Sequence, residues 1–111
     1  MNEAQRTAPA NPSRVTFEIV MLRIKPGVEI SAFIAADHNM EVNFVSLQHG
    51  FISREVGLSK DGRDFFVIVR WATLEDAEAA AAAFFASPWG SERADPTDVV
   101  LFNHFVVGMA K

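Results

Sequence analysis

The sequence predicts an α+β domain whose elements follow the order strand, helix, strand, strand, helix, strand. Apolar runs rich in β-branched residues near residues 15–24, 51–71 and 98–108 indicate strands. The central run is divided by Lys60-Asp61-Gly62, which is typical of a hairpin turn, and helical patterns separate it from the other two runs. With 111 residues, the chain has the length of one domain.

Composition excludes several classes of function. The net charge is −4 and acids and bases are scattered, so no basic patch for a nucleic acid is expected. The absence of cysteine excludes disulfides and thiolate metal ligands. No apolar run approaches the ~20 residues of a membrane span, and the N-terminus lacks a signal-like apolar segment, so we expect a cytoplasmic protein. Residues 1–14 are polar and aperiodic, which predicts a disordered arm before a single domain at 15–111.

The first half of the domain is predicted to hold one strand and one helix. In the strand at 15–24, Glu18 is a carboxylate among apolar neighbours. His49-Gly50 is expected to close the helix, with glycine suited to a left-handed cap. The helix is predicted over Val28 to about Gln48, because an apolar stripe recurs there at three- and four-residue steps: Ile30, Phe33, Ile34, Met40, Phe44, Val45 and Leu47.

The second half repeats the plan after the hairpin strands at 51–58 and 64–71. Thr73 is predicted to cap the second helix by accepting a hydrogen bond from the amide of Asp76. This helix is rich in alanine, so it can lie close against a sheet, and it is expected to end at Ser87-Pro88. A loop over residues 89–97 and a last strand at 98–108 complete the domain.

This order is that of a ferredoxin-like βαββαβ fold, a four-stranded antiparallel sheet with two helices on one face. The strands are apolar on both sides, so the second face of the sheet also needs cover. A second copy of the same face is the simplest cover, and two such sheets would close into a dimeric α/β barrel. The sequence therefore predicts a homodimer.

Three short motifs resemble a known family. Arg23-Ile24-Lys25-Pro26-Gly27, then Gln48-His49-Gly50-Phe51 with Arg54, then Val69-Arg70-Trp71 with Thr73, look like the dimeric α/β-barrel superfamily. Within it, the chain is most similar to the antibiotic-biosynthesis-monooxygenase-like proteins. The resemblance implies the ferredoxin-like fold, a homodimer, and either no assigned activity or cofactor-independent oxygenation of aromatic polyketides.

The resemblance also argues against one activity of that family. Its haem-degrading members have an asparagine on the first strand, a tryptophan at the end of the third strand and a histidine on the second helix. Trp71 matches that tryptophan, but the first strand has no asparagine and residues 74–87 contain no histidine. The polyketide oxygenases combine the same tryptophan with an asparagine four residues earlier, where this chain has Val67.

Charged residues in the strands are the first candidates for a ligand site. If the hairpin turns about Asp61, Ile52 faces Arg70 and Arg54 faces Ile68, so both arginines share one face within reach of Glu18. Two guanidinium groups and a carboxylate in apolar surroundings can anchor an anionic ligand. The same groups can instead form a structural ion-pair network, because an unpaired buried charge is costly.

Further candidates are aromatic or titratable. Trp71 ends its strand where a pocket between sheet and helices would open, and it either forms a wall of that pocket or fills the core. His104 and His38 are candidates for proton transfer, although a histidine satisfied within the core is the commoner case for a position such as His104. Asn103 is a further candidate for ligand binding.

The neighbours of His38 do not indicate a metal site. Asp37 and Glu41 lie close to it along the predicted helix, but helical spacing supplies no third ligand. We therefore expect no metal and no cofactor.

Two functions follow. The first is a small homodimeric α/β-barrel protein that binds a small aromatic or acidic metabolite between sheet and helices. The alternative is a cofactor-independent monooxygenase acting on an aromatic, polyketide-like substrate. An open cavity beside Trp71 favours a ligand, whereas a cavity filled by Phe84, Phe85 and Trp89 would exclude one.

Overall fold

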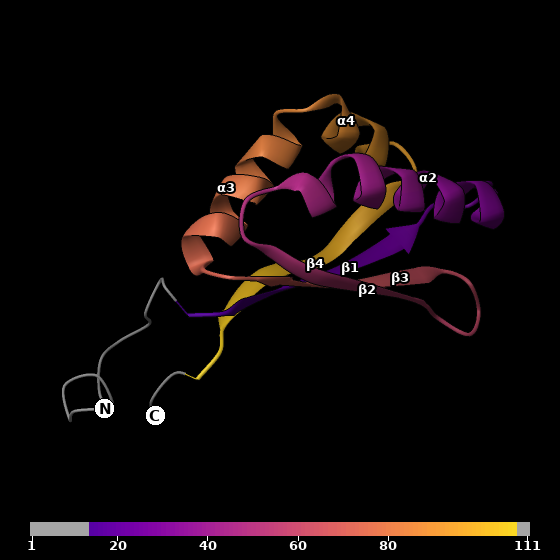
Figure 1. Cartoon of the computed structure of the whole chain (residues 1–111). Coiled ribbons are helices and arrows are strands. Elements are labelled where there is room, and N and C mark those ends of the chain that lie inside the picture. The colour runs from indigo at the N-terminus through magenta and orange to yellow at the C-terminus, as the bar shows by residue number, and fades with distance from the viewer. Residues whose placement is uncertain (1–13, 109–111) are drawn as a thin grey trace, which may run out of the picture.

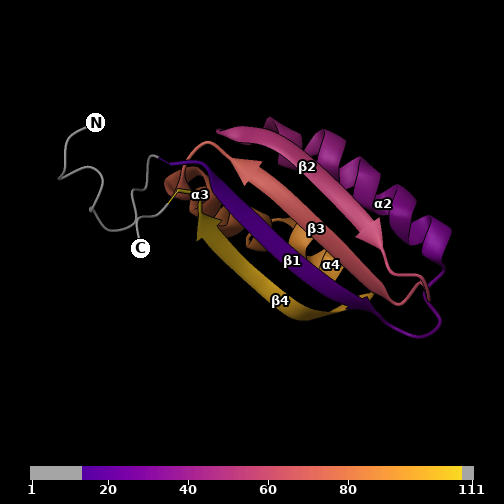
Figure 2. The same cartoon turned by 90° about the horizontal axis from the view of Figure 1, so that it is seen from below.

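A single antiparallel sheet organises the computed structural model, which describes residues 14–108. Its strands are hydrogen-bonded in the order β2-β3-β1-β4, so the first strand lies inside the sheet and the last at an edge (Figure 2). This is the predicted ferredoxin-like arrangement. The predicted arm lies outside the described residues, apart from Arg14. The strands are β1 (Thr16–Ile24), β2 (Phe51–Leu58), β3 (Asp64–Trp71) and β4 (Thr97–Val106).

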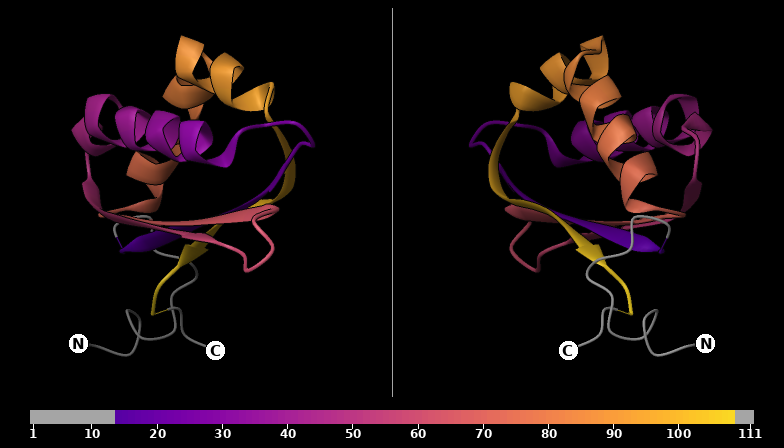
Figure 3. Two further views of the ribbon diagram at one scale, coloured as in Figure 1. Left: turned by 90° about the vertical axis from the view of Figure 1, so that its right-hand side faces the viewer. Right: turned by 90° about the vertical axis from the view of Figure 1, so that its left-hand side faces the viewer.

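All helices of the described residues cover the same face of the sheet (Figures 1 and 3). Thr73 caps α3 as predicted, with its hydroxyl accepting from the Asp76 amide at 3.0 Å. None of these helices is long and apolar enough to cross a membrane. They are α2 (Ile30–Asn43), the 3-10 turn η1 (Val45–Leu47), α3 (Leu74–Phe85) and α4 (Pro88–Ala94).

The helical boundaries correct two predictions. The first helix is shorter than expected: Glu29 caps its start by accepting from the amides of Ser31 and Ala32, and the chain breaks into η1 after Phe44. Residues 89–97 were expected to form a loop, but most of them belong to α4. The chain leaves α3 before Pro88, and Pro88 is the first residue of α4. Proline is suited to this position because the first amide of a helix has no hydrogen-bond partner within the helix.

The hairpin register corrects the predicted placement of the two arginines. Ser53, not Ile52, lies opposite Arg70, and Arg54 lies opposite Val69. The difference arises from an irregularity between Phe51 and Ser53, which shifts the pairing by one residue. Arg54 therefore faces the helices, whereas Arg70 lies on the opposite side of the sheet.

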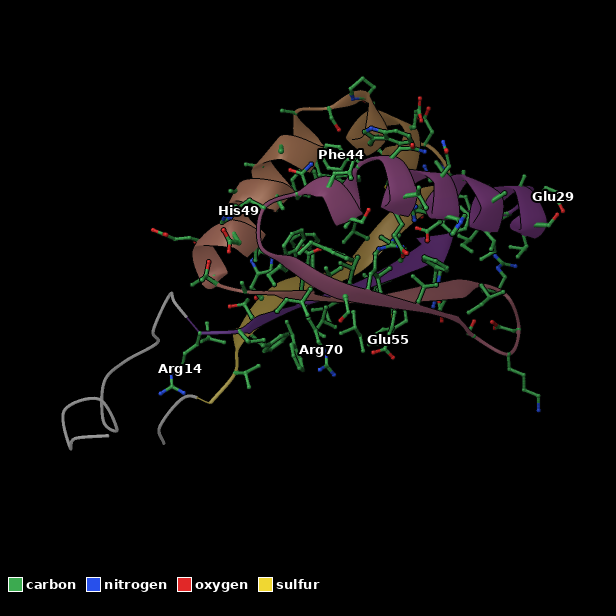
Figure 4. The ribbon with its side chains drawn as sticks, in the orientation of Figure 1. Arg14, Glu29, Phe44, His49, Glu55 and Arg70 are labelled. Carbon is green, nitrogen blue, oxygen red and sulfur yellow. The ribbon has the colours of Figure 1, made fainter. Side chains whose placement is uncertain are left out.

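The helix-covered face carries the hydrophobic core, and the opposite face is also apolar. Figure 4 shows Arg70 and Glu55 on the open side, pointing away from the helices. The strand residues buried under the helices are Thr16, Val20, Leu22, Ile24, Phe65, Val67, Val69, Trp71 and Thr97. The register places Phe17, Ile19, Met21, Phe66, Ile68, Leu101 and Phe105 on the opposite face, hereafter the open face.

Gly50 and Gly62 provide a test of the two turns that flank β2. Both have positive φ, +83° and +74°, but a Cβ at Gly62 would meet open space and one at Gly50 would overlap the Asp76 side chain. We expect Gly62→Ala to cost about 1–2 kcal/mol of unfolding free energy and Gly50→Ala clearly more. Urea unfolding measures both, and equal losses would contradict the role of the Asp76 contact.

Candidate functional site

A cavity of about 270 Å³ lies between the sheet and the helices. This is just below the usual volume range of small-molecule sites. Most of its wall is apolar or aromatic: Val20, Leu22, Met40, Phe44, Val45, Val67, Val69, Trp71, Ala80, Ala81, Phe84, Phe85, Gly90, Ala94, Val99 and Phe102. The polar lining residues are Glu18, Gln48, Arg54, Arg93 and Thr97.

The cavity stays open because small residues of α3 face the sheet. Ala80 and Ala81 line it where larger side chains would close it. Phe84 and Phe85 stand in its wall, and the Phe85 ring contacts that of Phe102 on β4 at a centroid distance of 5.6 Å. Trp89 lies elsewhere, beside a smaller cleft, so these three aromatic residues do not fill the cavity.

Trp71 forms part of the cavity wall at the end of β3. Its side chain is only 2 % exposed, and the ring of Phe51 packs edge-on against it at 5.9 Å. The indole Nε1 is buried without a hydrogen-bond partner among the described residues. A buried unpaired donor is costly, and a bound acceptor oxygen would relieve that cost.

Arg54 is the centre of a buried ionic cluster that joins three elements. Its guanidinium donates to both carboxylate oxygens of Asp37, each at 2.8 Å, and to Glu41 at 2.9 Å. Arg93 of α4 donates to the same Asp37 at 2.5 Å and stacks over the Phe33 ring. Arg54 and Asp37 side chains are 3 % and 4 % exposed, so neither is left to water.

The charges of this cluster hold one another ionised. Burial favours the neutral form of Asp37, but hydrogen bonds and charges from Arg54 and Arg93 outweigh it and keep the pKa of Asp37 below its usual value. Burial likewise opposes the charge of Arg54, and Asp37 and Glu41 raise its pKa in spite of it. Two cations and two carboxylates therefore balance beside the cavity.

The sequence contained a signal for this cluster. Asp37 lies between Phe33 and Met40 on the buried face of α2, and Glu41 follows one turn later. A buried carboxylate requires a cation nearby, and the next strand carries Arg54 among apolar residues. These acids contact arginines, and no group of three metal-ligating residues occurs within residues 14–108.

Glu18 and His104 form a second polar pair at the cavity wall. They lie opposite each other on β1 and β4, with His104 Nε2 2.9 Å from Glu18 Oε1. Burial raises the pKa of Glu18, because His104 and the more distant Arg54 compensate only part of the lost hydration. Glu18 lines the cavity. His104 does not line it, but it is hydrogen-bonded to Glu18.

The predicted site residues thus divide into two groups. Glu18, Arg54 and Trp71 meet at the cavity. Arg70 and Asn103 do not, because both lie on the open face, where the Arg70 guanidinium covers the Phe17 ring at 4.8 Å. His38 is exposed on α2 and does not line the cavity.

Solved structures share this fold at low sequence identity. SnoaB, a cofactor-independent oxygenase from Streptomyces nogalater, aligns with a TM-score of 0.73 and 13 % identity over 85 % of this chain and 93 % of its own. A candidate monooxygenase from Shewanella loihica gives 0.66 and 16 %, covering 87 % and 97 %. A conserved protein from Methanosarcina mazei gives 0.60 and 11 %, covering 90 % and 96 %.

These neighbours confirm the resemblance at the level of the fold. The chain has the same ferredoxin-like fold as SnoaB and as solved candidate antibiotic-biosynthesis monooxygenases. The sequence matches no protein-family model and no curated protein. At identities below one in five, the likeness defines the fold and not the reaction.

The ionic cluster predicts a large effect of removing its central cation. Arg54→Met leaves Glu41 without its partner and Asp37 with one cation, so we expect unfolding free energy to fall by about 3–5 kcal/mol. Arg23→Met is the matched control, because the Arg23–Asp64 pair is exposed and should barely affect stability. Urea unfolding compares them, and similar midpoints would contradict a structural role for Arg54.

Proposed function

We propose that the protein is a homodimer that binds a small aromatic molecule in the cavity of each protomer. The observation that carries this proposal is the open, largely apolar cavity with a tryptophan, a buried acid and few other polar groups in its wall. Such a lining favours flat apolar ligands and orients them through a small number of hydrogen bonds.

The charges favour an aromatic ligand over an acidic one. Arg54 and Arg93 reach the cavity, but Asp37 and Glu41 already neutralise them. The remaining charged lining residue is Glu18, which would repel an anion. An acidic metabolite would have to break the buried ion pairs to gain a partner.

The open face supports the homodimer. Its apolar residues come from β1, β3 and β4, and no helix of the described residues covers it (Figure 3). Arg70 and Glu55 carry opposite charges on this face. In a two-fold dimer each charge can meet its opposite on the partner, because the same surface is used twice.

The homodimer predicts a solution mass of twice 12.2 kDa by light scattering. Phe105 is 48 % exposed on the open face. Phe105→Glu should convert the dimer to a monomer, because the new charge would be buried against the second copy. Leu47→Glu is the control, on the exposed turn η1 away from this face. A monomeric mass of the wild-type chain at all concentrations would refute the dimer.

A second function is cofactor-independent oxygenation of the bound aromatic molecule. Two observations favour it: the likeness of fold to SnoaB, and Trp71 in the cavity wall with a buried Nε1 that has no partner among the described residues. A hydrogen bond from this nitrogen would stabilise negative charge on an oxygen of the ligand as it reacts with dioxygen. Val67 stands where the resembling oxygenases have asparagine, so Trp71 would act without that partner.

Oxygen uptake with a hydroquinone substrate separates the two functions. If the protein is an oxygenase, Trp71→Phe should slow uptake about 100-fold, because it removes a donor while keeping a flat ring. Trp89→Phe is the matched control, since Trp89 does not line the cavity. Ligand binding without any uptake by the wild-type protein would leave the binding function and reject the oxygenase.

A further inference from the structure

Glu18 is a cavity-lining carboxylate that no arginine or lysine of the described residues contacts directly, and its hydrogen-bond partner is His104. One of its oxygens, Oε1, is held by His104 Nε2 at 2.9 Å, which leaves Oε2 as the oxygen available to a ligand. The side chains of Glu18 and His104 are 13 % and 15 % exposed, so the pair is fixed in packed surroundings. A fixed acceptor at an apolar wall is suited to selecting a ligand by its donor groups.

The charged groups around Glu18 come from two strands. His104 of β4 bonds it directly, and Arg54 of β2 acts on it at longer range. The α3 side chains in the cavity wall are alanine and phenylalanine, and Arg93 of α4 is bound by Asp37. Because hydration of the carboxylate is poor, its pKa is raised and it is a stronger hydrogen-bond acceptor than an exposed glutamate.

Trp71 provides an aromatic wall beside Glu18 on the neighbouring strand. Glu18 pairs with Val69 in the β1–β3 register, so Trp71 is its diagonal neighbour on the same face. Diagonal neighbours are separated by about 7–8 Å. A ligand whose hydroxyl reaches the Glu18 carboxylate can therefore also contact the Trp71 ring.

We propose that the Glu18 carboxylate, positioned by His104, selects ligands that carry a phenolic hydroxyl by accepting its hydrogen. The proposal rests on the proposed function, because it requires an aromatic ligand in the cavity. Glu18 contacts the ligand, whereas His104 is a positioning residue that orients the carboxylate and sets the pH at which it is ionised.

Binding of 2-naphthol and 2-methoxynaphthalene to the full chain tests the proposal by calorimetry. The two probes share the ring system, and only the first can donate a hydrogen bond. We expect wild-type protein to prefer 2-naphthol at least about tenfold, which corresponds to about 1.4 kcal/mol. Glu18→Gln should remove most of this preference, whereas the matched change Glu78→Gln on the exposed side of α3 should keep it.

The pH profile separates positioning by His104 from a merely structural role. The preference for 2-naphthol should rise as Glu18 loses its proton. His104 lowers the pKa of Glu18 by its hydrogen bond and charge, so His104→Gln should move this rise to higher pH. An unmoved profile would remove His104 from the proposal.

The outcomes also separate this proposal from the proposed function. Equal affinity of wild-type protein for both naphthalenes, or a preference that survives Glu18→Gln, would overturn the role of Glu18 and leave aromatic binding intact. Failure of both probes to bind would reject aromatic binding and this inference together.

Discussion

The bidentate ion pair between Arg54 and Asp37 is the interaction on which the arrangement of the helices over the sheet depends. It fastens α2 to the edge strand β2, and Arg93 extends it to α4. A buried pair gains little over an apolar contact of the same shape, but losing one partner is costly. The cluster therefore specifies how the elements meet more than it adds to stability, and it places two helices around the cavity.

The cavity exists because the two helices fill the space above the sheet differently. Toward α2 the interface holds the ionic cluster and the aromatic contact between Phe33 and Phe65. Toward α3 it holds alanines, which do not fill the space. Few polar residues remain in this wall outside the ionic cluster: Glu18, which His104 holds, Gln48, Thr97 and Trp71, whose buried Nε1 has no partner among the described residues.

The two faces of the sheet give the molecule two separate surfaces. The helix-covered face holds the cavity, and the open face presents an apolar surface with Arg70 and Glu55 upon it. The one-residue register shift in the hairpin is responsible for this division of charge, since it sends Arg54 to one surface and Arg70 to the other. A second copy on the open face would leave the cavity in each protomer intact.

The sequence by itself determined the order of the four strands and the two longer helices, the hairpin turn, the Thr73 cap and the position of Trp71 at the end of a buried strand. These depend on local periodicity, propensity and capping, which few neighbouring residues settle. It could not determine the hairpin register, because the irregularity near Ile52 leaves no pattern in the residues. Nor could it join Asp37 to Arg54 and Arg93, or Glu18 to His104, 86 positions away. Only the tertiary structure decided which charged residues pair. A buried charge needs an oppositely charged group close to it in space, and that group can lie far away in the sequence.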